Sequence, residues 1–210
     1  MIVAIDGPAG AGKSTVARRL AERLGFRYLD TGAMYRALAW LALREGVGLE
    51  DEDELARLAA AHPVALDDAG RVVIAGVDVS QAIRSAQIDR AVPVVARHPR
   101  VRAVMRQRQR ELAEERDAVV EGRDIGTVVA PQAEVKVYLT AREEVRARRR
   151  LADRPDVGVD ALATDLRLRD RSDAARMEPA PDAVLIDTSD LGVDEVVARI
   201  EALVRQRLPA

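Results

Sequence analysis

The chain has 210 residues, with 33 Lys and Arg against 35 Asp and Glu, a formal net charge of −2 and no cysteine. The missing cysteine excludes a disulfide framework and cysteine-ligated metal sites, and the balanced charge with 2% aromatic residues argues against nucleic-acid binding. We expect no membrane segment and no signal peptide, because no apolar run of about 18 residues occurs and the first residues lack a basic region. A cytoplasmic location is therefore expected.

The first half of the chain predicts a strand, a glycine-rich loop, helices and a small sheet. The apolar run at 2–5 indicates a buried strand, and the helix that follows the loop is expected to stop at Gly25. Further helices are predicted over 34–45 and 51–61. Residues 64–79 alternate between apolar and polar side chains and contain two turn signals, so they predict a small antiparallel sheet.

The second half alternates between helical and strand patterns. Short apolar runs bounded by breakers predict buried strands, and arginine-rich segments between them predict helices. The strands are expected at 118–121, 135–139 and 183–187, and the helices at 100–116, 142–152 and 160–176. A last helix, capped by Asp194, is expected to bury Val197, Ile200, Val204 and Leu208. This order predicts an α/β domain with a mainly parallel sheet.

One motif fixes the class of ligand. The segment Gly7-Pro8-Ala9-Gly10-Ala11-Gly12-Lys13-Ser14, followed by Thr15, matches G-x-x-x-x-G-K-[ST] between a predicted strand and a predicted helix. The glycines allow a tight turn whose N–H groups face phosphate oxygens, the lysine reaches the outer phosphates, and the Ser14 hydroxyl suits Mg²⁺. The sequence therefore predicts a site for ATP and Mg²⁺ over residues 7–15.

The P-loop leaves several functions open. A GTP-dependent switch needs an Asn/Thr-Lys-x-Asp element, which is absent around Lys136, the only other lysine. A kinase for a neutral hydroxyl needs a carboxylate base, for which Asp124 and Asp30 are candidates. A non-enzymatic ATP-binding module would need a partner-binding extension, and none is obvious. The fourth hypothesis is a kinase whose phosphoryl acceptor is a nucleotide.

The segment 30–36, Asp-Thr-Gly-Ala-Met-Tyr-Arg, carries a second candidate site. Gly32 is expected to turn the chain into a helix, Thr31 offers a hydroxyl near its start, and Arg36 presents a planar, permanently charged fork for phosphate. Taken alone, the segment is more typical of an ordinary capped helix with a solvated arginine.

The combination of motifs resembles the bacterial cytidylate (CMP) kinase family, a branch of the P-loop nucleoside monophosphate kinases. The resemblance covers essentially the whole chain and is carried by GPAGAGKST at 7–15, LDTGAMYR at 29–36, EGRDIGTVV at 121–129, RDRSDAAR at 169–176 and VLIDTS at 184–189. It implies a P-loop NTPase-type parallel sheet flanked by helices, a small insert that binds the nucleoside monophosphate (NMP) and contains an antiparallel sheet, and an arginine-rich lid. The implied single domain, 1–210, has its core at 1–45, 117–140 and 177–210, its insert at about 46–116 and its lid at about 141–176.

The resemblance also implies a role for individual residues. ATP phosphates would lie on residues 7–15, and CMP would contact Thr31, Tyr35 and Arg36, with Arg36 on its phosphate. The other implied CMP ligands are Arg123 at the phosphate, Asp124 near the cytosine, Arg102 and Arg176 at the base, and Arg169 with Asp173 at the sugar hydroxyls. Residues 169, 173 and 176 are spaced to share one side of a helix. At the family's base-contacting serine in the insert this chain has Pro93, which implies a broader choice of acceptor.

The expected chemistry is electrostatic. The attacking atom of a nucleoside monophosphate is already an anionic oxygen, so Mg²⁺, Lys13 and arginines would stabilise the transferred phosphoryl without a strong general base. In the implied lid, Arg146 and Arg150 share a helix face and are the preferred catalytic arginines, and Glu121 or Asp124 is a candidate for holding Mg²⁺ through water. His62 and His98 each precede a proline and are expected to be exposed. We expect a monomer acting on CMP, dCMP and ATP, with no nucleic-acid or membrane partner.

Overall fold

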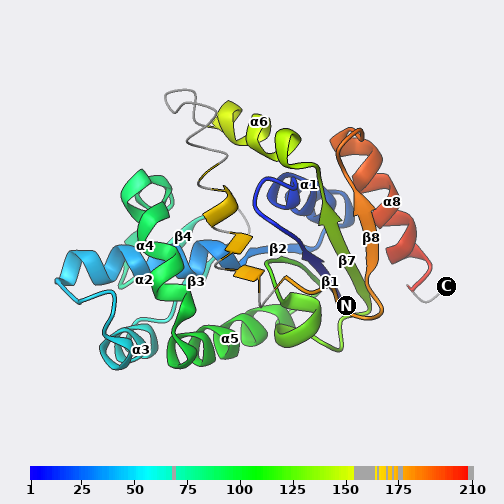
Figure 1. Ribbon diagram of the computed structural model, residues 1–210. Coiled ribbons are helices and arrows are strands. Elements are labelled where there is room, and N and C mark those ends of the chain that lie inside the picture. The colour runs from blue at the N-terminus through cyan, green and yellow to red at the C-terminus, as the bar shows by residue number, and fades with distance from the viewer. Residues whose placement is uncertain are drawn as a thin grey trace. The chain divides into compact units, whose positions relative to one another are not determined.

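The chain folds around a five-stranded sheet in the order β2-β6-β1-β7-β8. The computed structural model in Figure 1 shows β7 lying between β1 and β8. The structure describes residues 1–67, 70–153, 164, 166–168, 170–171, 173–174 and 177–207. The pairs β1–β6, β1–β7 and β7–β8 are parallel. The strands are β1 (Ile2–Asp6), β2 (Arg27–Asp30), β6 (Ala118–Glu121), β7 (Val135–Thr140) and β8 (Val184–Asp187).

Helices and a small second sheet complete the described part of the chain. The helices are α1 (Lys13–Leu24), α2 (Thr31–Glu45), α3 (Glu52–Ala61), α4 (Ala86–Arg97), α5 (Pro99–Glu114), α6 (Glu143–Asp153) and α8 (Val193–Arg205). Two short helical turns are η1 (Ala82–Arg84) and the π-helical η2 (Ile125–Val129). The second sheet, β3 (Ala65–Leu66), β4 (Val72–Ile74) and β5 (Val77–Asp78), is antiparallel. The predicted fold class, including this small antiparallel sheet, is confirmed.

The contacts divide the chain into two compact units. The first comprises Met1–Tyr28 and Arg116–Ala210, and the second comprises Leu29–Glu115. The second unit contains the small sheet, in which Ala75 and Gly76 both have positive φ values, 49° and 73°, as a tight two-residue hairpin requires. The predicted boundaries of core, insert and lid stay a prediction.

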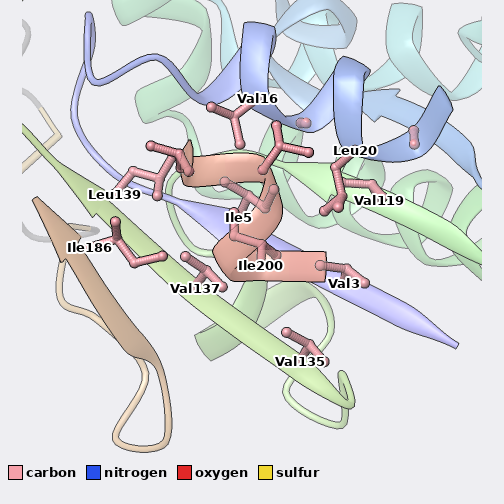
Figure 2. Close-up of a cluster of buried hydrophobic side chains, with 14 of the residues drawn as sticks. Val3, Ile5, Val16, Leu20, Val119, Val135, Val137, Leu139, Ile186 and Ile200 are labelled. Atoms are coloured by element: carbon pink, nitrogen blue, oxygen red, sulfur yellow. The ribbon is translucent and has the colours of Figure 1, made fainter. Parts of the chain in front are cut away.

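The core of the first unit lies between one face of the large sheet and the helices α1 and α8. Alternate strand residues such as Val3 and Ile5 of β1 point to this face and are fully buried. Figure 2 shows them beside Leu20 of α1 and Ile200 of α8. Burial of this apolar layer anchors the glycine-rich loop between β1 and α1.

Two helix starts differ from the prediction. α2 begins at Thr31 because the Asp30 carboxylate accepts a hydrogen bond from the Ala33 N–H at 2.9 Å, so Gly32 lies inside the first turn instead of forming the entry turn. α8 follows Gly192, whose N–H donates to the Glu195 carboxylate at 2.7 Å. The predicted Asp194 cap is therefore wrong: Asp194 lies in the first turn of α8.

Other differences concern unpredicted elements and one histidine. β2 and α4 were not expected, because β2 has only four residues and Pro93 interrupts the pattern of α4. His98 is only 8% exposed, and its Nε2 lies 2.8 Å from the Leu49 carbonyl oxygen, so the prediction of an exposed His98 is wrong. Most of the predicted helix 160–176 and Leu208 lie outside the described residues.

Candidate phosphate-binding site

The glycine-rich loop joins β1 to α1 as the sequence predicts. Gly7, Gly10 and Gly12 have φ values of 143°, 77° and 91°, a region that side chains with a Cβ rarely adopt. A Cβ on Gly7 would lie 2.1 Å from the Leu139 carbonyl oxygen, so this position accepts only glycine. Gly12 caps α1, and the positive end of that helix favours an anion beside the loop.

Side chains from outside the loop hold its carbonyl groups in place. Five consecutive carbonyl oxygens, those of residues 7–11, each lie within hydrogen-bond distance of a side-chain donor. The donors form what we call the carbonyl collar: Arg123 at Gly7, Lys13 at Pro8 (2.9 Å), Arg146 at Ala9 (3.1 Å), Arg149 at Gly10 (3.5 Å) and Thr188 at Ala11 (3.0 Å). The collar therefore brings four cations, those of Lys13, Arg123, Arg146 and Arg149, to the loop.

Arg123 lies in the turn after β6 and links three parts of the first unit. Its Nε donates to the Asp173 carboxylate at 3.1 Å, and its Nη1 donates to the Gly7 carbonyl. The next residue, Asp124, is 9% exposed and precedes the π-helical turn η2, with its carbonyl accepting from Val128 and Val129. Such turns are common at functional sites. The predicted residues Lys13, Arg123 and Asp173 thus gather at the loop.

The carboxylate of Asp6, the last residue of β1, fixes the start of η2. Its Oδ1 accepts from the Ile125 N–H at 2.9 Å and its Oδ2 from the Gly126 N–H at 2.8 Å. Asp6 is 5% exposed, and this burial raises the pKa of its carboxyl group, although the two N–H donors and Lys13 act in the opposite direction.

The helix α6 supplies two arginines to the loop. Arg146 is 8% exposed and donates to the Ala9 carbonyl, while its Nη2 lies 2.7 Å from the Asp170 carboxylate. Arg149 donates to both the hydroxyl (2.9 Å) and the carbonyl (2.7 Å) of Thr188. The sequence indicated Arg146 and Arg150; Arg150 is half-buried on α6, and its role stays a prediction.

A hydroxyl and a carboxylate meet at the first turn of α1. The Ser14 hydroxyl donates to Glu121 Oε2 at 3.0 Å, and the Tyr28 hydroxyl donates to Glu121 Oε1. Glu121 is 3% exposed, and the Tyr28 ring lies 4.8 Å from the Arg18 guanidinium carbon. Among the described residues there is no group of three or more His, Cys, Asp or Glu that could hold a metal alone. This donor set fits Mg²⁺, which keeps waters and takes few protein ligands beside phosphate oxygens.

The second unit carries the other predicted acceptor residues. Arg36 of α2 donates to the buried Asp89 carboxylate of α4 and lies 3.5 Å from the Ile83 carbonyl oxygen. Burial lowers the pKa of the Arg36 guanidinium, which nevertheless stays charged at neutral pH. Thr31 is buried at the start of α2, and Tyr35 is half-buried one residue before Arg36.

Of the three remaining predicted acceptor residues, one lies within the described part of the chain. Arg102 is half-buried near the start of α5 in the second unit, whereas Arg169 and Arg176 lie outside the described residues. The sequence missed several residues that hold the site: Asp6, Tyr28, Asp89, Arg149, Asp170 and Thr188. The available signals were the i, i+3 spacing of Arg149 from Arg146, the polar last residue of β1 and the polar residue that follows β8.

No helix in the described part of the chain has the length and hydropathy that crossing a bilayer would need.

Comparisons with known proteins identify the relatives of this chain. The family model for cytidylate kinase matches residues 3–206. The cytidylate kinase of Geobacillus kaustophilus is 48% identical over 217 residues, covering 98% of this chain and 97% of that protein. The cytidylate kinase of Caldanaerobacter subterraneus subsp. tengcongensis is 45% identical over 212 residues, covering 97% of this chain and 94% of that protein. A solved shikimate kinase from Bacteroides thetaiotaomicron is 16% identical, with a TM-score of 0.53 and 98% of each chain covered, and shares the fold alone.

Proposed function

This chain belongs to the cytidylate kinase family, and we propose on that premise that it transfers the γ-phosphoryl group of ATP to CMP and to dCMP by electrostatic catalysis at the glycine-rich loop. The carbonyl collar is the observation that supports this most directly. It brings Lys13, Arg123, Arg146 and Arg149 to consecutive carbonyls of one loop, and so concentrates positive charge where phosphates would bind.

The ATP phosphates are assigned to Gly7–Thr15 in this proposal. The left-handed glycines and the N-terminus of α1 favour an anion at this loop. Ser14 and Glu121 would hold Mg²⁺, which when bound neutralises charge on the phosphate oxygens. The structural support for this assignment is the contact between the Ser14 hydroxyl and the buried Glu121 carboxylate.

The acceptor nucleotide is assigned to the residues that the family resemblance implies. Arg36 and Arg123 would bind the CMP phosphate. The remaining assigned acceptor residues are Thr31 and Tyr35 on the nucleotide, Asp124, Arg102 and Arg176 at the base, and Arg169 with Asp173 at the sugar hydroxyls. Arg36 and Arg123 are each already oriented by a carboxylate, Asp89 and Asp173 respectively, within their own units. A guanidinium held in this way loses less conformational entropy when it binds phosphate.

The mechanism requires no strong general base. A phosphate oxygen of CMP is anionic at neutral pH, so the barrier lies in bringing several negative charges together and aligning them. Lys13, Arg123, Arg146 and Arg150 would stabilise the charge spread over the transferred phosphoryl. Asp124 and Asp30 are not needed as bases, and Asp30 already accepts the Ala33 N–H as the cap of α2.

We also infer where the enzyme acts and with which partners. It is proposed to be a cytoplasmic monomer whose ligands are small nucleotides, without nucleic-acid or membrane partners. Sedimentation velocity across a range of concentrations tests the monomer, and a concentration-dependent dimer would contradict it.

An acceptor screen tests the proposed function. ADP release is measured with CMP, dCMP, UMP, AMP and shikimate at saturating ATP and Mg²⁺. We expect the highest kcat/KM with CMP or dCMP and no turnover of shikimate, which carries only neutral hydroxyls as acceptors. AMP as the best acceptor would overturn the proposal.

A further inference from the structure

Four hydrogen bonds fasten the turn that carries Arg123 and Asp124 to the end of β1. The Gly122 N–H donates to the Ile5 carbonyl at 3.0 Å, and the Arg123 side chain donates to the Gly7 carbonyl. Between these two, the Asp6 carboxylate accepts the Ile125 and Gly126 N–H groups. Three consecutive residues of the β1 end thus hold the whole turn, and Asp6 alone does so through its side chain.

The two N–H groups that Asp6 accepts begin the turn η2. The first N–H groups of any helical turn lack partners within that turn, and a carboxylate with two oxygens satisfies two of them. Here the carboxylate belongs to the last residue of β1, so it also sets the distance between the turn η2 and the glycine-rich loop that follows β1. Arg123 and Asp124 lie directly before these two N–H groups and take their positions from them.

The Asp6 carboxylate is buried, and its position depends on the two N–H groups that it accepts. Burial raises the pKa of the carboxyl group, because it disfavours the ionised form. Asp124 and Lys13 are the charged groups that act on it, with opposite signs.

We propose that Asp6 is a positioning residue for phosphoryl transfer, which holds Arg123 and Asp124 in register with the glycine-rich loop. The proposal rests on the proposed function of Arg123 as a ligand of the CMP phosphate. The Asp6 side chain is bonded to backbone N–H groups, so it acts through Arg123 and Asp124 and is not itself assigned to a substrate.

A double-mutant cycle on the full chain tests this role. Asp6→Asn keeps the size of the side chain but turns one acceptor into a donor that faces an N–H group. We expect Asp6→Asn to lower kcat/KM for CMP by about 10-fold or more and to change KM for ATP by less than about 3-fold. In an Arg123→Ala background the same substitution should lower kcat/KM for CMP by a smaller factor, because the part of its effect that acts through Arg123 is already lost.

The outcomes separate the two proposals. Arg123→Ala with an unchanged CMP profile would overturn the function proposed for Arg123. A large Arg123→Ala effect together with an equal Asp6→Asn loss in both backgrounds, or with no Asp6→Asn loss, would overturn the role of Asp6. Val3→Ala is the matched control, since Val3 lies in the same strand and is fully buried in the apolar core; it should lower the melting temperature without changing either KM.

Two further measurements apply if Asp6→Asn does not fold. Asp6→Ser removes the charge and leaves one smaller acceptor, and its expected kinetic pattern is the same. Amide hydrogen exchange of the wild-type chain is the other measurement: the Ile125 and Gly126 amides should be protected as strongly as those of β1. Rapid exchange at both amides would overturn the proposal without any variant.

Discussion

The guanidinium of Arg36 is paired with the carboxylate of Asp89, a residue that is only 5% exposed and belongs to α4, 53 residues further along the chain. This pair links α2 to α4 inside the second unit. A buried carboxylate beside a half-buried guanidinium neutralises its charge and fixes its direction. Arg36 is therefore held before any phosphate reaches it.

Asp89→Ala should weaken binding of the acceptor. Without the carboxylate the Arg36 side chain regains rotamer freedom, so we expect KM for CMP to rise about 3- to 10-fold while KM for ATP stays unchanged. Initial-rate kinetics with each substrate varied in turn measure this. Arg97→Ala is the control, because Arg97 also belongs to α4 but is exposed and pairs with Glu50. Equal effects of the two substitutions would contradict the prediction.

Pro93→Ser should sharpen the choice of base. Pro93 lies inside α4 and cannot donate a backbone hydrogen bond to the Asp89 carbonyl one turn earlier, whereas serine restores both an N–H and a hydroxyl. We expect the ratio of kcat/KM for CMP over UMP to rise several-fold if the position faces the base. The acceptor screen on both proteins measures it, and an unchanged ratio would remove residue 93 from base recognition.

Tyr28→Phe should alter the dependence on Mg²⁺. The substitution removes one hydrogen bond to the buried Glu121 carboxylate, whose other oxygen accepts from Ser14. We expect a loss of about 1–2 kcal/mol in the free energy of unfolding and a higher Mg²⁺ concentration for half-maximal activity. Urea denaturation and a Mg²⁺ titration provide the two measurements. Phe26→Leu, a change in a half-buried apolar residue of the same unit, should leave the Mg²⁺ titration in place.

Thr188→Val should weaken ATP binding more than CMP binding. The Thr188 hydroxyl lies 3.0 Å from the carbonyl oxygens of both Ala11 and Thr140 and accepts from Arg149, so its loss loosens the glycine-rich loop. We expect KM for ATP to rise about 3- to 10-fold and stability to fall by about 1–3 kcal/mol. Thr140→Val is the matched control, since Thr140 contributes only its carbonyl to this contact; an ATP KM that rises equally in both variants would refute the role of the hydroxyl.

The stability of the wild-type chain relative to Asp6→Asn should depend on pH in a defined direction. The raised pKa of Asp6 means that the folded chain binds the proton more tightly than the unfolded one. Its contribution to stability is therefore present below the ordinary pKa of aspartate and is lost as the pH rises through the raised value. The free energy of unfolding is measured for both proteins at about pH 4.5 and about pH 7.5. The value for wild type, relative to that for Asp6→Asn, should be larger at the lower pH. A larger relative value at the higher pH would contradict the burial effect.

Local patterns made the first unit predictable. The strand at 2–5 and the helix after the glycine-rich loop are confirmed, because an apolar run before G-x-x-x-x-G-K-S and a 3.6-residue period after it leave few alternatives. Asp30 illustrates what such patterns hide: its carboxylate caps α2, which begins at Thr31, three residues before the predicted start of the helix. A side-chain cap moves a helix boundary without changing the apolar period.

Long-range contacts account for what the sequence could not supply. Arg149 and Thr188 meet across 39 residues, and Asp6 reaches Gly126 across 120 residues, so neither contact leaves a local pattern. Arg123 and Asp173 were each recognisable from a motif, but the contact between them, across 50 residues, was not predicted. Which guanidinium of α6 faces the loop depends on how the helix is rotated, and a spacing rule that paired Arg146 with Arg150 left Arg149 out.

The carbonyl collar means that the glycine-rich segment does not carry its own architecture. Its donors come from α1, the turn after β6, α6 and the end of β8, which span most of the first unit. Transplanting GPAGAGKS alone into another α/β protein would therefore transfer the motif without most of the side chains that hold its carbonyl groups. A successful graft has to bring the arginines and the threonine that brace the loop from outside.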